Sequence, residues 1–252
     1  MRGDAHSDAH AFRRASLSER DQQIIELVGR LRQVEARHVA VALFAGHASG
    51  TPLDRALKRL VTGHYLARMA RSVGGDGGGS GQYVYQLGRA GWRLLGRSGE
   101  YWAFRSVSAH TLGIADCFAA LRQMEHDGDA SLLDFTPEPA CHRRIGGIQL
   151  TPDAYTEVGF RQVGVKVTAW LEIDRATEHG EVIQKKCIRY WHAYERWSAG
   201  TFPYVVFVVP DEQRQRQIER VISGGPDEAL ALFKVCVLTS FPQVICKLAQ
   251  QR

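Results

Sequence analysis

The sequence predicts a mixed α/β protein built in two parts. Three segments with apolar residues at helical spacing, followed by two short strand-like runs, occupy most of the first hundred residues. After residue 108, helical segments alternate with strand-like runs. The clearest run is 165–174, where apolar residues recur at every second position. A length of 252 residues suits one large domain or two small ones, each with a core of its own.

Composition narrows the class of protein. Hydrophobic residues make up 44% of the chain and charged residues 23%, as in ordinary soluble globular proteins. No run of eighteen apolar residues occurs, so no membrane association is expected. The first fifteen residues lack the apolar stretch of a secretory signal and are predicted to form a disordered arm, 1–15. The five cysteines are odd in number and contain no CxxC pair, which favours a reducing, cytoplasmic setting over disulfides or zinc.

Positive charge gathers in the first part of the chain. Residues 1–108 carry 16 Lys and Arg against 9 Asp and Glu, a balance of +7, whereas residues 109–252 carry 16 against 18, a balance of −2. Such an excess is expected where a surface meets the phosphates of DNA. An unevenly charged solvated surface would give the same balance, so charge does not decide between the two.

The first part has the element order of a winged helix-turn-helix module. Ser18 and Asp21 predict a capping box at the start of the first helix. A second helix is expected at about 35–45, and the third is expected to start at Thr51-Pro52, with Thr51 as its cap and Pro52 as its first helical residue. Two strands at 64–73 and 82–87 follow, joined by the glycine-rich run GGDGGGSG, and a closing helix is expected at 87–95. We therefore predict a DNA-binding domain over 16–97 and a linker over 98–108.

Basic residues place the predicted DNA contact on the third helix and the hairpin. Arg55, Lys58 and Arg59 lie three and four residues apart and so share one helix face. Arg68 and Arg71 lie on the first hairpin strand. In a winged helix the third helix enters the major groove and the wing lies over the backbone, so double-stranded DNA is the expected partner. A basic solvated face and a protein-binding platform are the alternatives.

The glycine-rich run does not predict a nucleotide site. No Lys-Ser or Lys-Thr follows the run, and it does not open a helix, so it is not a P-loop. A wing tip is the better interpretation, and no nucleotide cofactor is expected.

The second part, 109–252, has the element order of a restriction-endonuclease-like core of the PD-(D/E)xK type with a mixed sheet. Many α/β folds share fragments of this order, so order alone is weak evidence. The expected elements are a helix at 110–124, strands at 132–135, 148–158 (interrupted by Pro152) and 165–174, a helix at 178–198, a strand at 203–210, a helix at 213–223, a strand at 230–238 and an extension.

Acidic residues on two of these strands predict a metal site. Glu172 and Asp174 share one face at the end of the strand at 165–174, and Asp153 lies on the strand before it. Cleavage of a phosphodiester uses a divalent cation, and Mg²⁺ prefers carboxylate oxygens. We predict Asp153, Glu172 and Asp174 as ligands of Mg²⁺ or Mn²⁺. Lys186, one turn before Tyr190 on the next helix, completes the predicted catalytic set.

Each of these residues also has a plain structural interpretation. Asp153 follows a proline and fits a turn. Glu172 and Asp174 fit a solvated strand end, or caps of the next helix. Lys185 and Lys186 fit a charged surface.

The chain resembles a known family, the replication-relaxation proteins of bacterial plasmids and integrative elements. These proteins are related to relaxases of the MobC type. The resemblance covers nearly the whole chain, and its most specific block runs from Glu172 to Tyr190. The residues that carry it are Leu17-Ser18-Glu19-Arg20-Asp21, Tyr83-Val84-Tyr85-Gln86-Leu87, His110-Thr111-Leu112 with Asp116, Pro152-Asp153-Ala154, Glu172-Ile173-Asp174-Arg175-Ala176-Thr177-Glu178, Lys186 with Tyr190, and Phe202-Pro203 before Phe207-Val208-Val209-Pro210.

The resemblance implies a winged helix joined to a restriction-endonuclease-like domain that acts in plasmid replication or DNA transfer. It implies the same four site residues, with Glu178 as a helper. One departure is that Asp174 stands where the standard nuclease pattern has lysine, two residues after the glutamate. No His-x-His motif of the common relaxase class occurs, and the sequence does not single out a covalent nucleophile among Tyr155, Tyr190 and Tyr194.

Two functions follow from these patterns. The first is a metal-dependent DNA-nicking enzyme of the relaxase or nuclease kind. The second is a non-catalytic replication initiator or transcriptional regulator, in which a degenerate nuclease-like domain serves as scaffold or as the surface of a homodimer.

Overall fold

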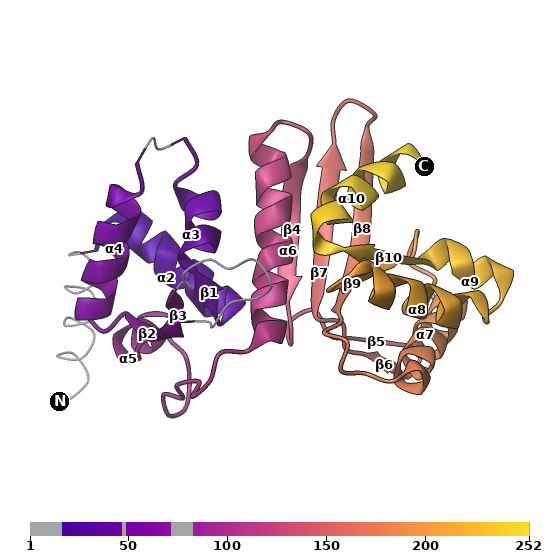
Figure 1. The fold of residues 1–252 in the computed structure, drawn as a ribbon, viewed down its shortest axis with the longest axis horizontal. Coiled ribbons are helices and arrows are strands. Elements are labelled where there is room, and N and C mark those ends of the chain that lie inside the picture. The colour runs from indigo at the N-terminus through magenta and orange to yellow at the C-terminus, as the bar shows by residue number, and fades with distance from the viewer. Residues whose placement is uncertain (1–16, 47–48, 72–82, 252) are drawn as a thin grey trace. The chain divides into compact units, whose positions relative to one another are not determined.

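The structure, a computed structural model, describes residues 17–46, 49–71 and 83–251 (Figure 1). The predicted arm at 1–15 and the glycine-rich run at 74–81 lie outside the described residues. The chain divides into two compact units, 1–115 and 116–252, and the boundary falls within helix α6 (Ala109–His126). No helix in the described part of the chain is long and apolar enough to cross a membrane.

The N-terminal unit combines helices with a small antiparallel sheet. The strand order is β1-β3-β2. The two-residue strand β1 was not predicted, because two residues are too few to show an alternating pattern. In chain order the elements are α2 (Glu19–Leu31), β1 (Val34–Glu35), α3 (Ala36–Leu43), α4 (Thr51–Thr62), β2 (Leu66–Arg71), β3 (Tyr83–Leu87) and α5 (Arg89–Leu94).

The capping box predicted at the start of α2 is confirmed. The backbone N–H of Asp21 donates to Ser18 Oγ at 3.1 Å, and Ser18 N–H donates to Asp21 Oδ2 at 3.2 Å. Helix α4 begins at Thr51, so its cap is Gly50 rather than the expected Thr51, and proline lies in its first turn. The helix buries an apolar stripe of Leu53, Ala56, Leu57 and Leu60.

The segment predicted as a linker is hydrogen-bonded to the N-terminal unit. Tyr101 Oη donates to the carbonyl oxygen of Leu87 at 2.9 Å. Phe104 N–H donates to Gln86 Oε1 at 2.7 Å. Tyr101 and Phe104 are thus tied to β3 by hydrogen bonds, whereas Trp102 is largely exposed.

The C-terminal unit is built on a five-stranded mixed sheet, which confirms the mixed α/β class. Its elements after α6 are β4 (Ser131–Pro137), β5 (Arg143–Ile145), β6 (Ile148–Leu150), β7 (Ala154–Phe160), β8 (Val165–Ile173), α7 (Gly180–Glu195), β9 (Tyr204–Val209), α8 (Glu212–Ser223), α9 (Asp227–Leu232), β10 (Phe233–Val237), the short 3₁₀ helix η1 (Leu238–Ser240) and α10 (Phe241–Gln250).

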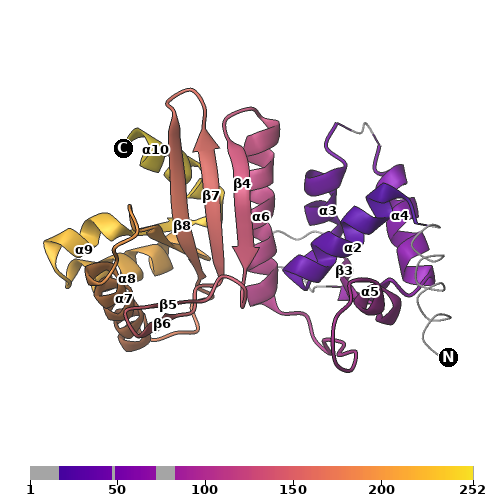
Figure 2. The same cartoon turned by 180° about the vertical axis from the view of Figure 1, so that it is seen from behind.

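The strand order in this sheet is β10-β9-β8-β7-β4 (Figure 1). Strands β8, β9 and β10 are parallel, whereas β4 and β7 run antiparallel to their neighbours. Helix α10 lies against one face of the sheet, as opposite views show (Figures 1 and 2). Side chains from α7 and α8 pack against the other face.

The structure changes three local interpretations of this unit. The expected strand at 148–158, interrupted by Pro152, is two elements in different sheets, because Pro152 cannot donate to the ladder: β6 pairs with β5 in a separate hairpin, and β7 joins the main sheet. The alternative that Glu172 lies at a solvated strand end is wrong, because both faces of β8 are buried from Val167 onward. The strand expected at 230–238 is shorter, since residues 230–232 end helix α9 and β10 spans 233–237. The expected C-terminal extension forms the amphipathic helix α10.

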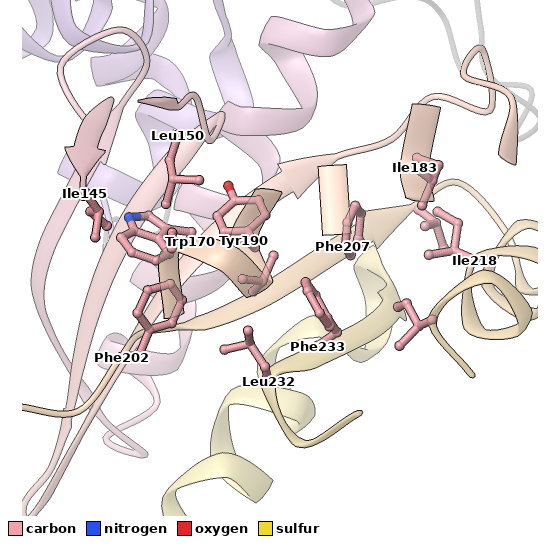
Figure 3. Close-up of a cluster of buried hydrophobic side chains, with 14 residues drawn as sticks. Ile145, Leu150, Trp170, Ile183, Tyr190, Phe202, Phe207, Ile218, Leu232 and Phe233 are labelled. Carbon is pink, nitrogen blue, oxygen red and sulfur yellow. The ribbon is translucent and has the colours of Figure 1, made fainter. Parts of the chain in front are cut away.

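The core beneath α7 and α8 is rich in aromatic side chains. Trp170 lies beside Tyr190, with ring centroids 5.7 Å apart, and packs edge-on against Phe202 at 4.8 Å (Figure 3). Phe207 and Phe233 extend this cluster toward β10. These contacts fix α7 on the sheet at the end of β8 where acidic residues gather.

The central strand should dominate the stability of this unit. Leu171 on β8 is fully buried, whereas Leu133 on the edge strand β4 is 57% exposed. We expect Leu171→Ala to lower the free energy of unfolding by about 2–5 kcal/mol. The matched substitution Leu133→Ala should change it by less than about 0.5 kcal/mol. Urea denaturation followed by tryptophan fluorescence measures both, and equal effects would contradict this placement of the core.

Candidate active site

Asp153 lies in the turn before β7 and reaches the end of β8. Its backbone N–H donates to the carbonyl oxygen of Leu171 at 2.9 Å, which extends the pairing of β7 with β8 by one residue. Its Oδ2 accepts a hydrogen bond from the backbone N–H of Ile173 at 2.6 Å. Asp153 is therefore hydrogen-bonded to the residues on both sides of Glu172, through its backbone to Leu171 and through its carboxylate to Ile173.

Glu172 is the buried centre of the site. Its side chain is on the face of β8 that α7 covers, and the residue is only 2% exposed. Tyr190 Oη donates to Oε1 at 2.5 Å. Lys186 Nζ lies 2.8 Å from Oε2 and forms an ion pair with it. Since Lys186 and Tyr190 are four residues apart on α7, one helix face supplies both partners.

Glu178 adds a second carboxylate to Lys186. It lies in the turn before α7, and its Oε2 is 3.3 Å from Lys186 Nζ. The ammonium group thus lies between a buried carboxylate and a half-buried one, at the end of β8.

Burial and charge act in opposite directions on this pair. Burial raises the pKa of Glu172 to about 7, and the charge of Asp153 acts the same way, whereas Lys186 and Tyr190 lower it. Burial alone would lower the pKa of Lys186. The charge and hydrogen bond of Glu172, with the charges of Glu178 and Asp153, outweigh burial and leave that pKa raised.

Asp174 has a different partner from the other two carboxylates. Arg214 of α8 binds it in a bidentate manner, with Nε 2.6 Å from Oδ2 and Nη2 2.9 Å from Oδ1. Arg214 Nη2 also donates to the backbone carbonyl of Glu178 at 2.7 Å, and Ala176 N–H donates to Asp174 Oδ2 at 3.0 Å. This network fixes the chain between β8 and α7 and thereby the position of Glu178.

The structure thus brings Asp153, Glu172 and Lys186 to one end of β8, with Asp174 next to them in its own ion pair. The metal role of these carboxylates stays a prediction. Sequence reasoning missed Arg214, because nothing in the spacing links residues forty positions apart.

Glu138 was also missed. It follows β4 directly, and its backbone N–H donates to the carbonyl oxygen of Asp153 at 2.8 Å. A carboxylate oxygen of Glu138 lies within 4.8 Å of one of Asp153. The available signal was an acidic residue at the end of a predicted strand, next to an antiparallel neighbour that begins with another acid.

The predicted DNA-binding residues of the N-terminal unit lie on α4 and β2. Arg55, Lys58 and Arg59 are exposed on α4. Arg59 forms an ion pair with the buried Asp21 of α2 at 2.6 Å, so its positive charge is partly neutralised within the unit. The guanidinium of Arg68 lies over the ring of Tyr83 at 4.2 Å. The side chain of Arg71 lies outside the described residues. DNA binding by these residues stays a prediction.

Comparison with known proteins finds a family match. The model of the family described as replication-relaxation matches residues 25–205. The matched range includes Asp153, Glu172 and Lys186, whereas Arg214 lies beyond it. Neither the curated proteins nor the solved structures contain a match.

The free energy of unfolding should depend on pH because Glu172 titrates. Its pKa is raised from 4.5 to about 7, so the folded chain holds a proton that the unfolded chain releases. The stabilisation from this group is therefore complete below pH 4.5 and is lost as the pH rises to about 7. Relative to Glu172→Gln, the wild type should lose up to about 3 kcal/mol of unfolding free energy across this window. Denaturant titrations at several pH values measure the difference, and a flat difference would contradict the raised pKa.

Proposed function

The chain belongs to the replication-relaxation family, and on this premise we propose that it nicks DNA in a metal-dependent reaction during plasmid replication or mobilisation. Family membership indicates the role in replication or mobilisation. The observation that carries the proposed chemistry is the buried Glu172 at the end of β8, with Lys186 on its Oε2 and Asp153 beside it.

The donor set suits a hard divalent cation. Asp153 and Glu172 supply carboxylate oxygens, the ligands that Mg²⁺ and Mn²⁺ prefer, and Glu138 lies close enough to Asp153 to take part. Such a cation, when bound, lowers the pKa of water and neutralises charge on the phosphate. Asp174 is assigned an orienting role, because its two oxygens are already bound to Arg214.

Lys186 has the geometry of a phosphate-binding group. Its ammonium carries a full positive charge, because the carboxylates around it raise its pKa, and it is about a quarter exposed. It can therefore contact a phosphate oxygen without leaving Glu172. In the proposed hydrolysis, water adds to phosphorus, one bond from phosphorus to a sugar oxygen breaks, and that oxygen takes up a proton.

For the N-terminal unit we propose a winged helix that delivers the chain to double-stranded DNA. The three exposed basic residues on one face of α4 support this assignment, as does the hairpin of β2 and β3 that follows the helices. Lys58 is the strongest candidate, since Arg59 also serves the ion pair with Asp21.

A second candidate function is a non-catalytic replication initiator or transcriptional regulator. Two observations favour it. Lys186 already compensates Glu172, and Arg214 already compensates Asp174, so the carboxylates are neutralised by the chain itself. A fold that needs no metal for its charge balance fits a scaffold as well as an enzyme.

We expect the two carboxylates to control nicking. Glu172→Gln and Asp153→Asn should slow the conversion of supercoiled DNA to open circles by about 100-fold or more, because the remaining groups cannot hold the cation. The assay uses Mg²⁺ or Mn²⁺ and agarose gel electrophoresis.

The control for these variants is Glu212→Gln, which removes an equal charge from a side chain that is 81% exposed on α8. It should nick at the wild-type rate. Equal nicking by wild type and both site variants would remove the catalytic assignment. The absence of nicking and of a Mn²⁺ site in calorimetry would favour the second candidate function.

We expect α4 to contact duplex DNA. Lys58→Ala should weaken binding and reduce the slope of log affinity against log salt by about 0.9 for one lost phosphate contact. Fluorescence anisotropy with a labelled duplex at several salt concentrations measures both. Arg93→Ala removes the same charge from α5 and should leave the slope unchanged. An unaltered slope in Lys58→Ala would show that α4 is not the contact.

A further inference from the structure

A cavity of about 480 Å³ lies on the face of the sheet that also carries Glu172. Its walls come from the β5-β6 hairpin, from β7 and β8 and from the segment after α7. This volume is in the range of sites that hold a small ligand. The lining is both basic and aromatic. Its charged and aromatic residues include Arg143, Arg144, Tyr155, Glu157, Lys166 and Trp197.

The charge of the cavity is positive. Its carboxylate, Glu157, accepts a hydrogen bond from Lys166 Nζ at 2.8 Å and one from Tyr155 Oη at 2.6 Å, so that its charge is compensated locally. Two arginines remain. Arg143 Nη1 donates to two backbone carbonyls, and Arg144 is exposed, with no ion pair in the described part of the chain. Arg144 is therefore available for an anionic ligand.

The aromatic walls are fixed. Trp197 Nε1 donates to the carbonyl oxygen of Gly200 at 3.1 Å, and its ring lies edge-on to Trp170 at 6.4 Å. Tyr155 is held by Glu157. Two aromatic rings in fixed positions next to an available arginine suit the binding of a nucleotide. Bases stack on aromatic rings, and phosphates bind to positively charged side chains.

The cavity and the candidate active site lie along the same face of β8. Side chains of β8 alternate between faces, so Glu172, Trp170, Thr168 and Lys166 share one face. Thr168 is four residues from Glu172, about 13 Å along the strand. Since a stacked strand rises about 3.4 Å per nucleotide and an unstacked strand is longer per nucleotide, that length spans at most about four nucleotides.

We propose that this cavity binds a nucleotide of single-stranded DNA a few positions from the phosphodiester at Glu172. Arg144 holds its phosphate, and Trp197 or Tyr155 stacks on its base. The proposal rests on the proposed DNA-nicking function and adds to it the form of the strand that is bound. A paired base in a duplex has both faces covered by its neighbours, so the ligand is an unstacked nucleotide.

Binding of a short fluorescein-labelled oligothymidine to the full chain tests the site. Anisotropy is measured in EDTA, so that cleavage plays no part. Arg144→Ala should weaken binding and reduce the salt slope by about 0.7 for one lost contact to a single strand. Trp197→Ala should weaken binding by about fivefold to 100-fold, the value of one stacked base.

Two matched variants separate the cavity from general effects. Arg216→Ala removes an arginine that is 59% exposed on α8 and should leave binding unchanged. Trp197→Phe keeps a ring and should restore most of the affinity lost in Trp197→Ala, which also tests whether the alanine variant has failed only by misfolding.

A photocrosslink gives an independent readout. A single strand that contains 5-iododeoxyuridine should crosslink to Tyr155 or Trp197, as mass spectrometry of the peptides identifies. A matching duplex should crosslink there much less. Crosslinks confined to other residues, or equal crosslinking by the duplex, would overturn the proposal.

The outcomes distinguish this proposal from the nicking function. If Arg144→Ala and Arg216→Ala bind the oligonucleotide equally while the wild type still nicks supercoiled DNA, the cavity is not a nucleotide site and the nicking function stands. If Arg144→Ala alone loses affinity while no nicking occurs with any metal, the cavity binds DNA and the catalytic assignment fails.

Discussion

A carboxylate buried in a protein core must be matched by charge or protonated, and Glu172 imposes this constraint on the C-terminal unit. The residue is 2% exposed at the end of β8, and the pairing of its two oxygens with Tyr190 and Lys186 fixes the rotation and depth of α7 against the sheet. The aromatic cluster around Trp170 then packs beneath the same helix. Glu172 therefore bears on both the fold and the candidate site, because its partners Tyr190 and Lys186 stabilise the buried carboxylate and also form that site.

The second ion pair has a distinct role beside the first. Asp174 and Arg214 join the end of β8 to α8, and Arg214 also binds the backbone at Glu178. These bonds fix the turn between β8 and α7 and place Glu178 next to Lys186. Glu172 and Asp174 thus differ in their partners: Asp174 braces the end of β8 through Arg214, whereas Glu172 lies with Lys186 in the candidate site. In the proposed active site, Lys186 of α7 supplies the ammonium group, since Asp174 stands where the standard nuclease pattern has lysine.

The distribution of positive charge supports two modes of contact with DNA. In the N-terminal unit, basic side chains on α4 form one exposed face, which suits the regular phosphates of a duplex. In the C-terminal unit, the basic residues of the cavity stand beside Trp197 and Tyr155, which suits an unstacked strand. The proposed nicking function needs both, because a protein that nicks DNA must find a duplex and then hold the strand that it opens.

The sequence by itself determined the mixed α/β class, the capping box at Ser18 and Asp21, the start of α4 to within one residue, and the presence of acids at the end of β8. These depend on neighbours a few residues apart, where periodicity and capping chemistry act directly. Only the tertiary structure decided that Glu172 is buried, that Lys186 and Tyr190 share it, and that Arg214 takes Asp174. It also separated 148–158 into two strands and placed Glu138 beside Asp153. Such pairings join residues that are distant in the chain, and they depend on sheet order and helix rotation, which no local pattern encodes.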